Sequence, residues 1–172
     1  SSVLVKPVSA DCNLACGYCF YSPKAALYPE TGRHRMGDGV LREFISQFMA
    51  LSGDRAAFCW QGGEPTLAGL DFYRRAVEYQ SLFGAPGQAV ENSLQTNGTL
   101  IDEAWARFLR RYRFLVGVSL DGPPELHDHY RRDHAGRPSH ERVMRGIGWL
   151  RRHEVDFNIL VLLNRVNVKH PK

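Results

Sequence analysis

Residues 89–122 read AVENSLQTNGTLIDEAWARFLRRYRFLVGVSLDG and contain one complete unit of the expected fold. Residues 89–96 predict a strand closed by an Asn-Gly turn, and residues 114–120 predict a second strand closed by an Asp-Gly turn. Between them Asp102 is placed to cap a helix with apolar side chains on one face: Ala104, Trp105, Phe108, Leu109 and Tyr112. A helix of this length allows a right-handed crossover, so the stretch predicts two parallel strands covered by a helix.

The same alternation of strand and helix patterns extends toward both ends of the chain. Apolar periodicity predicts three more strands, at 3–8, 56–60 and 155–163, and three more helices, at 40–51, 70–83 and 139–150, with Asp38, Asp71 and Ser139 near their starts. Residues 9–39 and 123–138 are expected to be polar loops. The pattern predicts an α/β fold with five parallel strands and four helices. Because the last strand would be an open edge, we expect residues 1–172 to be the N-terminal portion of a larger domain.

The composition is typical of a soluble globular protein. Hydrophobic residues make up 44% and charged residues 23% of the chain, and the mean hydropathy is −0.33, which excludes a disordered or collagen-like chain. No apolar run approaches the roughly 20 residues of a membrane-spanning helix, and the start lacks a secretory signal. We therefore expect a cytoplasmic protein with no membrane partner. The net charge of +4 is spread along the chain and does not indicate nucleic-acid binding.

Three of the four cysteines fall within the sequence CNLACGYC. Cys12, Cys16 and Cys19 are too close together to pair in unstrained disulfides, so they indicate a metal or cluster site in a reducing compartment. Three thiolates can hold three irons of a [4Fe-4S] cluster and leave the fourth iron open to a small molecule. A zinc site completed by His34 is the alternative, although the spacing does not match a zinc knuckle. Cys59 is expected to be a small buried residue.

Small and polar residues follow each of the first four predicted strands. The cysteine motif follows the first strand, the turn QGGEP at 61–65 the second, 96–98 the third and 119–122 the fourth. Ligands bind at the carboxyl ends of parallel strands, so we expect one site assembled from all four segments. Paired glycines allow a backbone to approach a ligand closely, Glu64 could receive an ammonium group, and Arg131 could bind a carboxylate. The histidines of the following loop lack the spacing of a metal site: His127, His129, His134 and His140.

Together these motifs resemble those of radical S-adenosylmethionine (SAM) enzymes. CNLACGYCF, WQGGEPTL, SLQTNGTL and VGVSLDGPPELHD follow the first four strands in that order, and the resemblance runs from about residue 5 to residue 168. KPVSADCNLACGYCFYSPK and LDGPPELHDHYR are similar to sequences of the anaerobic sulfatase-maturing enzymes. The resemblance implies a partial parallel (βα)6 barrel that is truncated in this chain.

The resemblance also implies roles for individual residues. Cys12, Cys16 and Cys19 would hold a [4Fe-4S] cluster whose open iron binds the amino and carboxylate groups of SAM. The residues implied to contact SAM are Tyr18 at the adenine, Gly62, Gly63 and Glu64 at the amino group, Ser119 and Arg131 at the carboxylate, and Asn97. Tyr21 and Gln61 would face a peptide substrate.

The implied reaction is reductive cleavage of SAM to methionine and a 5′-deoxyadenosyl radical. That radical would take a hydrogen from the β-carbon of a Cys or Ser in a sulfatase polypeptide, and a second one-electron oxidation would leave Cα-formylglycine. A one-electron reductant protein is the second implied partner. In the family, two auxiliary [4Fe-4S] clusters and the proposed catalytic base lie in a C-terminal extension. We therefore expect no catalytic base within these residues and no sulfatase maturation by this chain alone.

Two other functions remain as hypotheses from the sequence. A radical SAM maturase that forms thioether or carbon–carbon links in peptides would use the same cluster and SAM residues. A zinc-containing binding module with a basic surface would instead give a colourless protein after anaerobic reconstitution with iron and sulfide.

Overall fold

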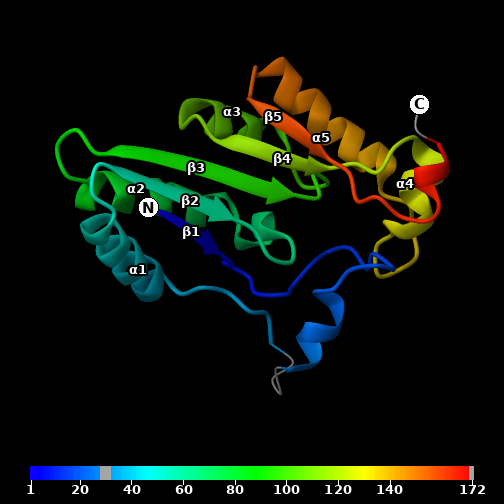
Figure 1. The fold of residues 1–172 in the computed structure, drawn as a ribbon, viewed down its shortest axis with the longest axis horizontal. Coiled ribbons are helices and arrows are strands. Elements are labelled where there is room, and N and C mark those ends of the chain that lie inside the picture. The colour runs from blue at the N-terminus through cyan, green and yellow to red at the C-terminus, as the bar shows by residue number, and fades with distance from the viewer. Residues whose placement is uncertain (28–31, 171–172) are drawn as a thin grey trace.

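A parallel sheet of five strands organises the computed structural model, which describes residues 1–27 and 32–170. The strands are β1 (Ser2–Val5), β2 (Arg55–Trp60), β3 (Ala89–Thr96), β4 (Leu115–Ser119) and β5 (Phe157–Leu160), and they lie side by side in that order (Figure 1). Because each strand pairs with the next one in sequence, every crossover steps in the same direction, as in a barrel. The sheet is not closed, so the predicted partial barrel of five strands is confirmed.

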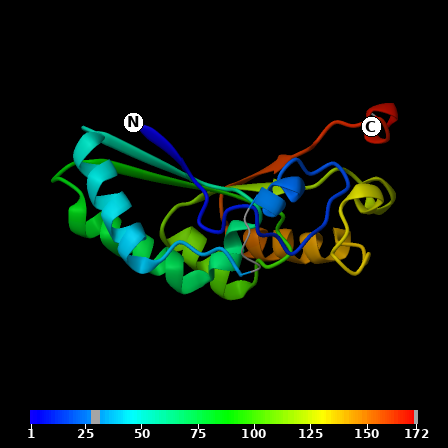
Figure 2. The same ribbon diagram turned by 90° about the horizontal axis from the view of Figure 1, so that it is seen from below.

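Helices cover one face of this sheet. The α-helices of the described residues are α1 (Asp38–Leu51), α2 (Leu70–Phe83), α3 (Glu103–Arg111), α4 (Pro124–Tyr130) and α5 (His140–Arg152), with short 3-10 helices η1 (Ser22–Leu27), η2 (Pro65–Ala68) and η3 (Asn167–Lys169). Figure 2 shows α1, α2, α3 and α5 on the same side of the strands. Asp102 caps α3 as predicted, because its side chain accepts a hydrogen bond from the Trp105 amide at 2.9 Å. None of the described helices has the length and apolar character needed to span a membrane.

The hydrophobic core lies between the sheet and these helices. Alternate side chains of the strands, such as Phe58, Trp60 and Val118, point into it and are almost completely buried. Burying a side chain of this size stabilises the fold by about 2 kcal/mol. On the opposite face, Leu4 and Leu115 are 50% and 46% exposed. One face of the sheet is therefore covered and the other is open.

Two predicted strands are shorter than their apolar patterns suggested. The first strand ends at Val5 rather than at residue 8, because Pro7 has no amide hydrogen to donate to a neighbouring strand. The last strand ends at Leu160 rather than at residue 163, since the amide of Leu162 donates to the Asp121 side chain instead of continuing the ladder.

The helix predictions also need correction. The loop predicted at 123–138 contains α4, whose few residues show no apolar periodicity for a sequence pattern to detect. Asp38 is the first residue of α1 and not its cap; its carboxylate binds Arg75 at 2.8 Å and the Tyr79 hydroxyl at 2.9 Å. Ser139 precedes α5, but its side chain makes no capping hydrogen bond.

Candidate active site at the carboxyl ends of the strands

A cavity of about 200 Å³ lies at the carboxyl ends of the strands. Every residue proposed for the site from the sequence lines this cavity except Glu64. Five further lining residues were not proposed as ligand contacts from the sequence: Leu14, Phe20, Gln95, Thr96 and Leu162. Leu14 and Thr96 lie within segments that were expected at the site, whereas Gln95 and Leu162 do not. The cavity is smaller than the 300–1,000 Å³ of most ligand sites. Gln61, Gln95 and Ser119 belong to the uncovered face of the sheet, so a ligand held here would extend over that face.

The three clustered cysteines share this cavity as free thiols. Burial is the main reason that the pKa of the Cys12 thiol is raised to about 12, and negative charge on Glu64, Cys16 and Cys19 acts in the same direction. The Leu14 amide donates a hydrogen bond to the Cys12 sulfur at 3.4 Å, and the Asn97 side-chain amide lies 3.8 Å from it. Three thiols with amide donors nearby form a donor set that suits an iron–sulfur cluster.

A zinc site is not supported by the same geometry. Within residues 1–27 and 32–170, no three His, Cys, Asp or Glu side chains are placed to hold one metal ion. His34, the proposed fourth zinc ligand, lies 2.9 Å from the Asp11 carboxylate instead. Cysteines that bind different irons of one cluster need not converge on a single point, so the arrangement fits a cluster better than zinc.

The cysteine loop is held by a segment that lies far away in the sequence. The Ala15 amide donates to the Arg132 carbonyl at 2.7 Å, and the Gly17 amide donates to the Tyr130 carbonyl at 3.0 Å. The ring of His134 bonds to the Cys12 carbonyl at 3.0 Å. Figure 1 shows the loop extending from β1 toward α4. The end of α4 thus fixes the backbone that presents the thiols.

The glycine pair in the QGGEP turn permits a close contact between two backbones. The Gly63 amide donates to the Ser9 carbonyl at 2.9 Å, and the Glu64 amide donates to the Asp11 carbonyl at 2.7 Å. Gly62 has a φ of +132°, which a side chain would strain. From the sequence, the two glycines were expected to let the backbone of the turn approach a ligand closely. The structure shows that they also let the turn pack against the start of the cysteine loop.

Replacing Gly63 by alanine is expected to destabilise this contact. The added Cβ would lie 2.0 Å from the Asp11 carbonyl oxygen, so one of the two backbones must move. We expect a loss of about 2–3 kcal/mol in the free energy of unfolding, measured by urea denaturation. Gly37→Ala is the matched control, because its Cβ meets nothing within 4 Å. If the two variants were equally stable, the close approach of the Gly63 and Asp11 backbones would not limit the residue at position 63.

The Glu64 carboxylate is completely buried and does not line the cavity, so its expected contact with an ammonium group stays a prediction. It accepts hydrogen bonds from the amide and hydroxyl of Thr66 at 3.0 and 2.6 Å. It also accepts from the Thr96 hydroxyl and the Asn97 amide, each at 2.7 Å. Burial raises the pKa of Glu64, and these donors oppose the shift. The carboxylate joins the ends of β2 and β3.

Asp121 links Arg131 and Tyr18 at the cavity wall. The Arg131 Nε donates to the Asp121 carboxylate at 2.8 Å, the Tyr18 hydroxyl donates to the same carboxylate, and the guanidinium lies 5.4 Å from the Tyr18 ring centre. Burial alone would raise the pKa of Asp121, but the hydrogen bonds from Arg131 and Tyr18 outweigh it and the pKa is lowered. The sequence showed Asp121 only as a turn residue, because its partners lie far away along the chain.

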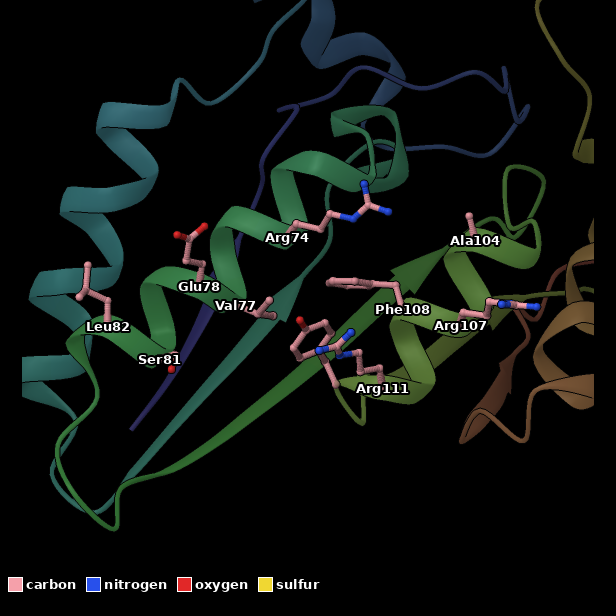
Figure 3. A pocket seen from close by; sticks show the side chains of 10 residues that line it. Arg74, Val77, Glu78, Ser81, Leu82, Ala104, Arg107, Phe108 and Arg111 are labelled. Atoms are coloured by element: carbon pink, nitrogen blue, oxygen red, sulfur yellow. The ribbon is translucent and has the colours of Figure 1, made fainter.

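A larger hollow of about 1,110 Å³ lies between α2 and α3 (Figure 3). Val77 of α2 and Phe108 of α3 line it together with Arg74, Arg107 and Arg111. None of the motifs that follow the strands contributes a residue to it. Its size alone therefore does not make it the active site.

The fold and the cavity define a class of protein. The family model of the radical SAM superfamily matches residues 7–172, and the chain belongs to that superfamily. Its relatives include the serine-type anaerobic sulfatase-maturating enzyme of Bacteroides thetaiotaomicron, which is 44% identical over 170 residues. The cysteine-type enzyme of Clostridium perfringens is 40% identical over 169 residues. The resemblance inferred from the motifs is thereby confirmed.

Solved structures of these enzymes have the same fold. Native anSMEcpe with bound AdoMet matches 98% of this chain with a TM-score of 0.92 at 40% identity, and its complex with AdoMet and the Kp18Cys peptide matches with a TM-score of 0.89. The chain covers 41% of the Bacteroides relative, 46% of the Clostridium relative, and 46% and 45% of the two solved chains. It thus spans less than half the length of the proteins it matches.

Proposed function

We propose that this chain carries the radical-generating centre of an anaerobic sulfatase-maturating enzyme. In this proposal, Cys12, Cys16 and Cys19 hold a [4Fe-4S] cluster, and SAM lies beside it over the open face of the sheet. The observation that carries the proposal is that three free thiols, a glycine turn and the Arg131 guanidinium share one cavity. The family membership and the bound AdoMet in similar structures support it.

The residues of the cavity suit the parts of SAM. Ser119 and Arg131 are proposed to bind the carboxylate, Gly62 and Gly63 the amino group, and Tyr18 the adenine. Arg131 already uses Nε and Nη2 on Asp121, at 2.8 and 3.4 Å, which leaves Nη1 for a further anion. Three N–H groups of Arg131, two on Nη1 and one on Nη2, therefore remain for the SAM carboxylate. Asn97 is proposed as a further contact, and the Glu64 carboxylate acts by holding the Asn97 backbone.

The chemistry that the cluster and SAM supply when bound is reductive cleavage of the sulfonium to methionine and a 5′-deoxyadenosyl radical. The chain's own residues orient the two groups and exclude competing partners. Tyr21 and Gln61 line the same cavity and are proposed to face a sulfatase polypeptide. The Lys6 ammonium lies 5.0 Å from the Tyr21 ring centre and holds the ring beside the cavity.

The proposed overall reaction converts a Cys or Ser of the polypeptide to Cα-formylglycine. One hydrogen atom leaves the β-carbon for the 5′-deoxyadenosyl radical. The carbon radical that remains would then lose one electron to an oxidant and the hydroxyl or thiol proton to a base. For cysteine, water supplies the carbonyl oxygen and the sulfur leaves as sulfide. We propose that auxiliary [4Fe-4S] clusters outside these residues take that electron, that a one-electron reductant protein is the donor, and that the enzyme works in the reducing cytoplasm.

The proposal is tested by anaerobic reconstitution of the chain with iron and sulfide, followed by SAM and a strong reductant. We expect 5′-deoxyadenosine and methionine in equal amounts, measured by mass spectrometry. A sulfatase peptide with deuterium on the β-carbon of its target Cys or Ser should transfer deuterium to the 5′-deoxyadenosine, even if formylglycine is not completed. A cluster-loaded chain that leaves SAM intact would refute the proposal. SAM cleavage without deuterium transfer would refute only the proposal that a sulfatase polypeptide is the substrate. It would favour the alternative hypothesis of a radical SAM maturase that acts on other peptides.

A further inference from the structure

A closed set of hydrogen bonds lies behind the cavity and includes His127, whose side chain is completely buried. Its Nδ1 accepts a hydrogen bond from the Asp121 amide at 3.2 Å, and its Nε2 lies 3.0 Å from the Ser139 hydroxyl. The Ser139 hydroxyl donates to the Arg131 carbonyl at 2.6 Å. The Arg131 side chain returns to the Asp121 carboxylate at 2.8 Å. The four residues therefore fix one another through both main chain and side chains.

The partners of His127 determine its tautomer. The Asp121 amide can only donate, so Nδ1 must be the acceptor. The single proton of the Ser139 hydroxyl goes to the Arg131 carbonyl, so Nε2 must carry the hydrogen and donate to Ser139. The geometry requires a neutral ring with its hydrogen on Nε2.

The charges around the ring agree with this assignment. Burial is the main reason that the pKa of His127 is lowered to about 4, and the nearby Arg131 charge acts in the same direction. Asp128 and Asp121 act in the opposite direction, and His140, whose ring centre is 5.5 Å away, lowers the pKa slightly more. The ring is therefore neutral at pH 7 and can keep both hydrogen bonds.

We propose that His127 is a positioning residue for the SAM carboxylate. By holding the Asp121 amide directly and the Arg131 carbonyl through Ser139, it fixes the Arg131 guanidinium at the wall of the cavity before the ligand binds. The proposal deepens the proposed function and rests on it, because it assumes that Arg131 binds SAM. The Asp121 carboxylate, which is 2% exposed and also accepts from the Leu162 amide at 3.0 Å, completes the support.

The test measures the dissociation constant of SAM for the cluster-loaded chain. We expect His127→Ala to weaken binding about tenfold, because Arg131 loses its fixed orientation. The rate of SAM cleavage at saturating SAM should change by less than about twofold, since the lost interaction is made equally before and during the reaction. His127→Gln can still donate to Ser139 and should recover part of the loss. His140→Gln is the matched control and should bind SAM like the wild type.

A double-mutant cycle with Arg131→Ala shows whether His127 acts through Arg131. We expect His127→Ala to have little further effect once Arg131 is alanine, because the group that it positions is gone. Additive effects of the two substitutions would overturn the proposal, and so would an unchanged dissociation constant in His127→Ala. A cluster-loaded wild-type chain that binds no SAM would overturn the proposed function itself and this role with it.

A spectroscopic readout makes the proposal testable without activity. In ¹⁵N nuclear magnetic resonance, His127 should remain neutral with its hydrogen on Nε2 as the pH falls to about 4. Between the ordinary histidine pKa near 6.5 and about pH 4, the unfolded chain binds a proton that the native chain does not, so stability decreases as the pH falls. This decrease should be smaller in His127→Gln. If His127→Ala does not fold, SAM binding by His127→Gln and this titration test the proposal in its place. A His127 ring that is charged at pH 7 would overturn the proposal.

Discussion

Replacing Cys16 by alanine is expected to leave the chain unable to retain an iron–sulfur cluster. Cys12, Cys16 and Cys19 are the thiols that line the cavity, and two thiolates cannot hold three irons of a four-iron cluster. After anaerobic reconstitution we expect about four irons per wild-type chain and fewer than about one in Cys16→Ala, measured together with acid-labile sulfide and visible absorption.

Cys59→Ala is the matched control for this experiment. Cys59 lies in β2, where it pairs in register with Leu4 and Ser93, and it does not line the cavity. We expect this variant to retain its full iron content and its brown colour. If Cys59→Ala lost the cluster while Cys16→Ala kept it, the ligand assignment would be wrong. A colourless wild-type chain that bound about one zinc would instead support the binding-module hypothesis.

Replacing Glu64 by alanine is expected to lower the free energy of unfolding by about 4 kcal/mol. The carboxylate is completely buried and accepts hydrogen bonds from two backbone amides and two hydroxyls, so its removal leaves several buried donors without a partner. Urea denaturation of the chain at pH 7 measures the effect. Because the Asn97 amide is one of these donors, we also expect weaker retention of iron.

Glu64→Gln separates the effect of the carboxylate from the effect of size. The amide group of glutamine carries two hydrogens, and in either orientation one of them faces the backbone amide of Thr66 or Asn97. We therefore expect a loss of about 2 kcal/mol with almost no change in volume. Glu43→Gln, on the exposed side of α1, should leave the stability unchanged. A Glu64→Gln variant as stable as the wild type would show that an acceptor-only group is not needed there.

The fold could be predicted from the sequence because its signals are local. Strand and helix periodicities alternate along the chain, and the Asp102 cap depends on an amide only three residues away. The signal fails where an element is short or where its end depends on a distant partner. Helix α4 has seven residues and no apolar stripe. Strand β5 ends early because the Leu162 amide donates a hydrogen bond to the Asp121 side chain.

The sequence by itself predicted the chemistry that is proposed for the site. Three features can be read directly from the order of residues in the chain: the spacing of Cys12, Cys16 and Cys19, the glycine turn, and the order of the motifs. The residues predicted from these features line one cavity in the structure, apart from Glu64. Only the tertiary structure decided that the Glu64 carboxylate is a buried support and that Asp121 and His127 stand behind Arg131. The physical reason is that a hydrogen bond depends on distance in space, and these partners meet only when the strand ends and α4 pack together.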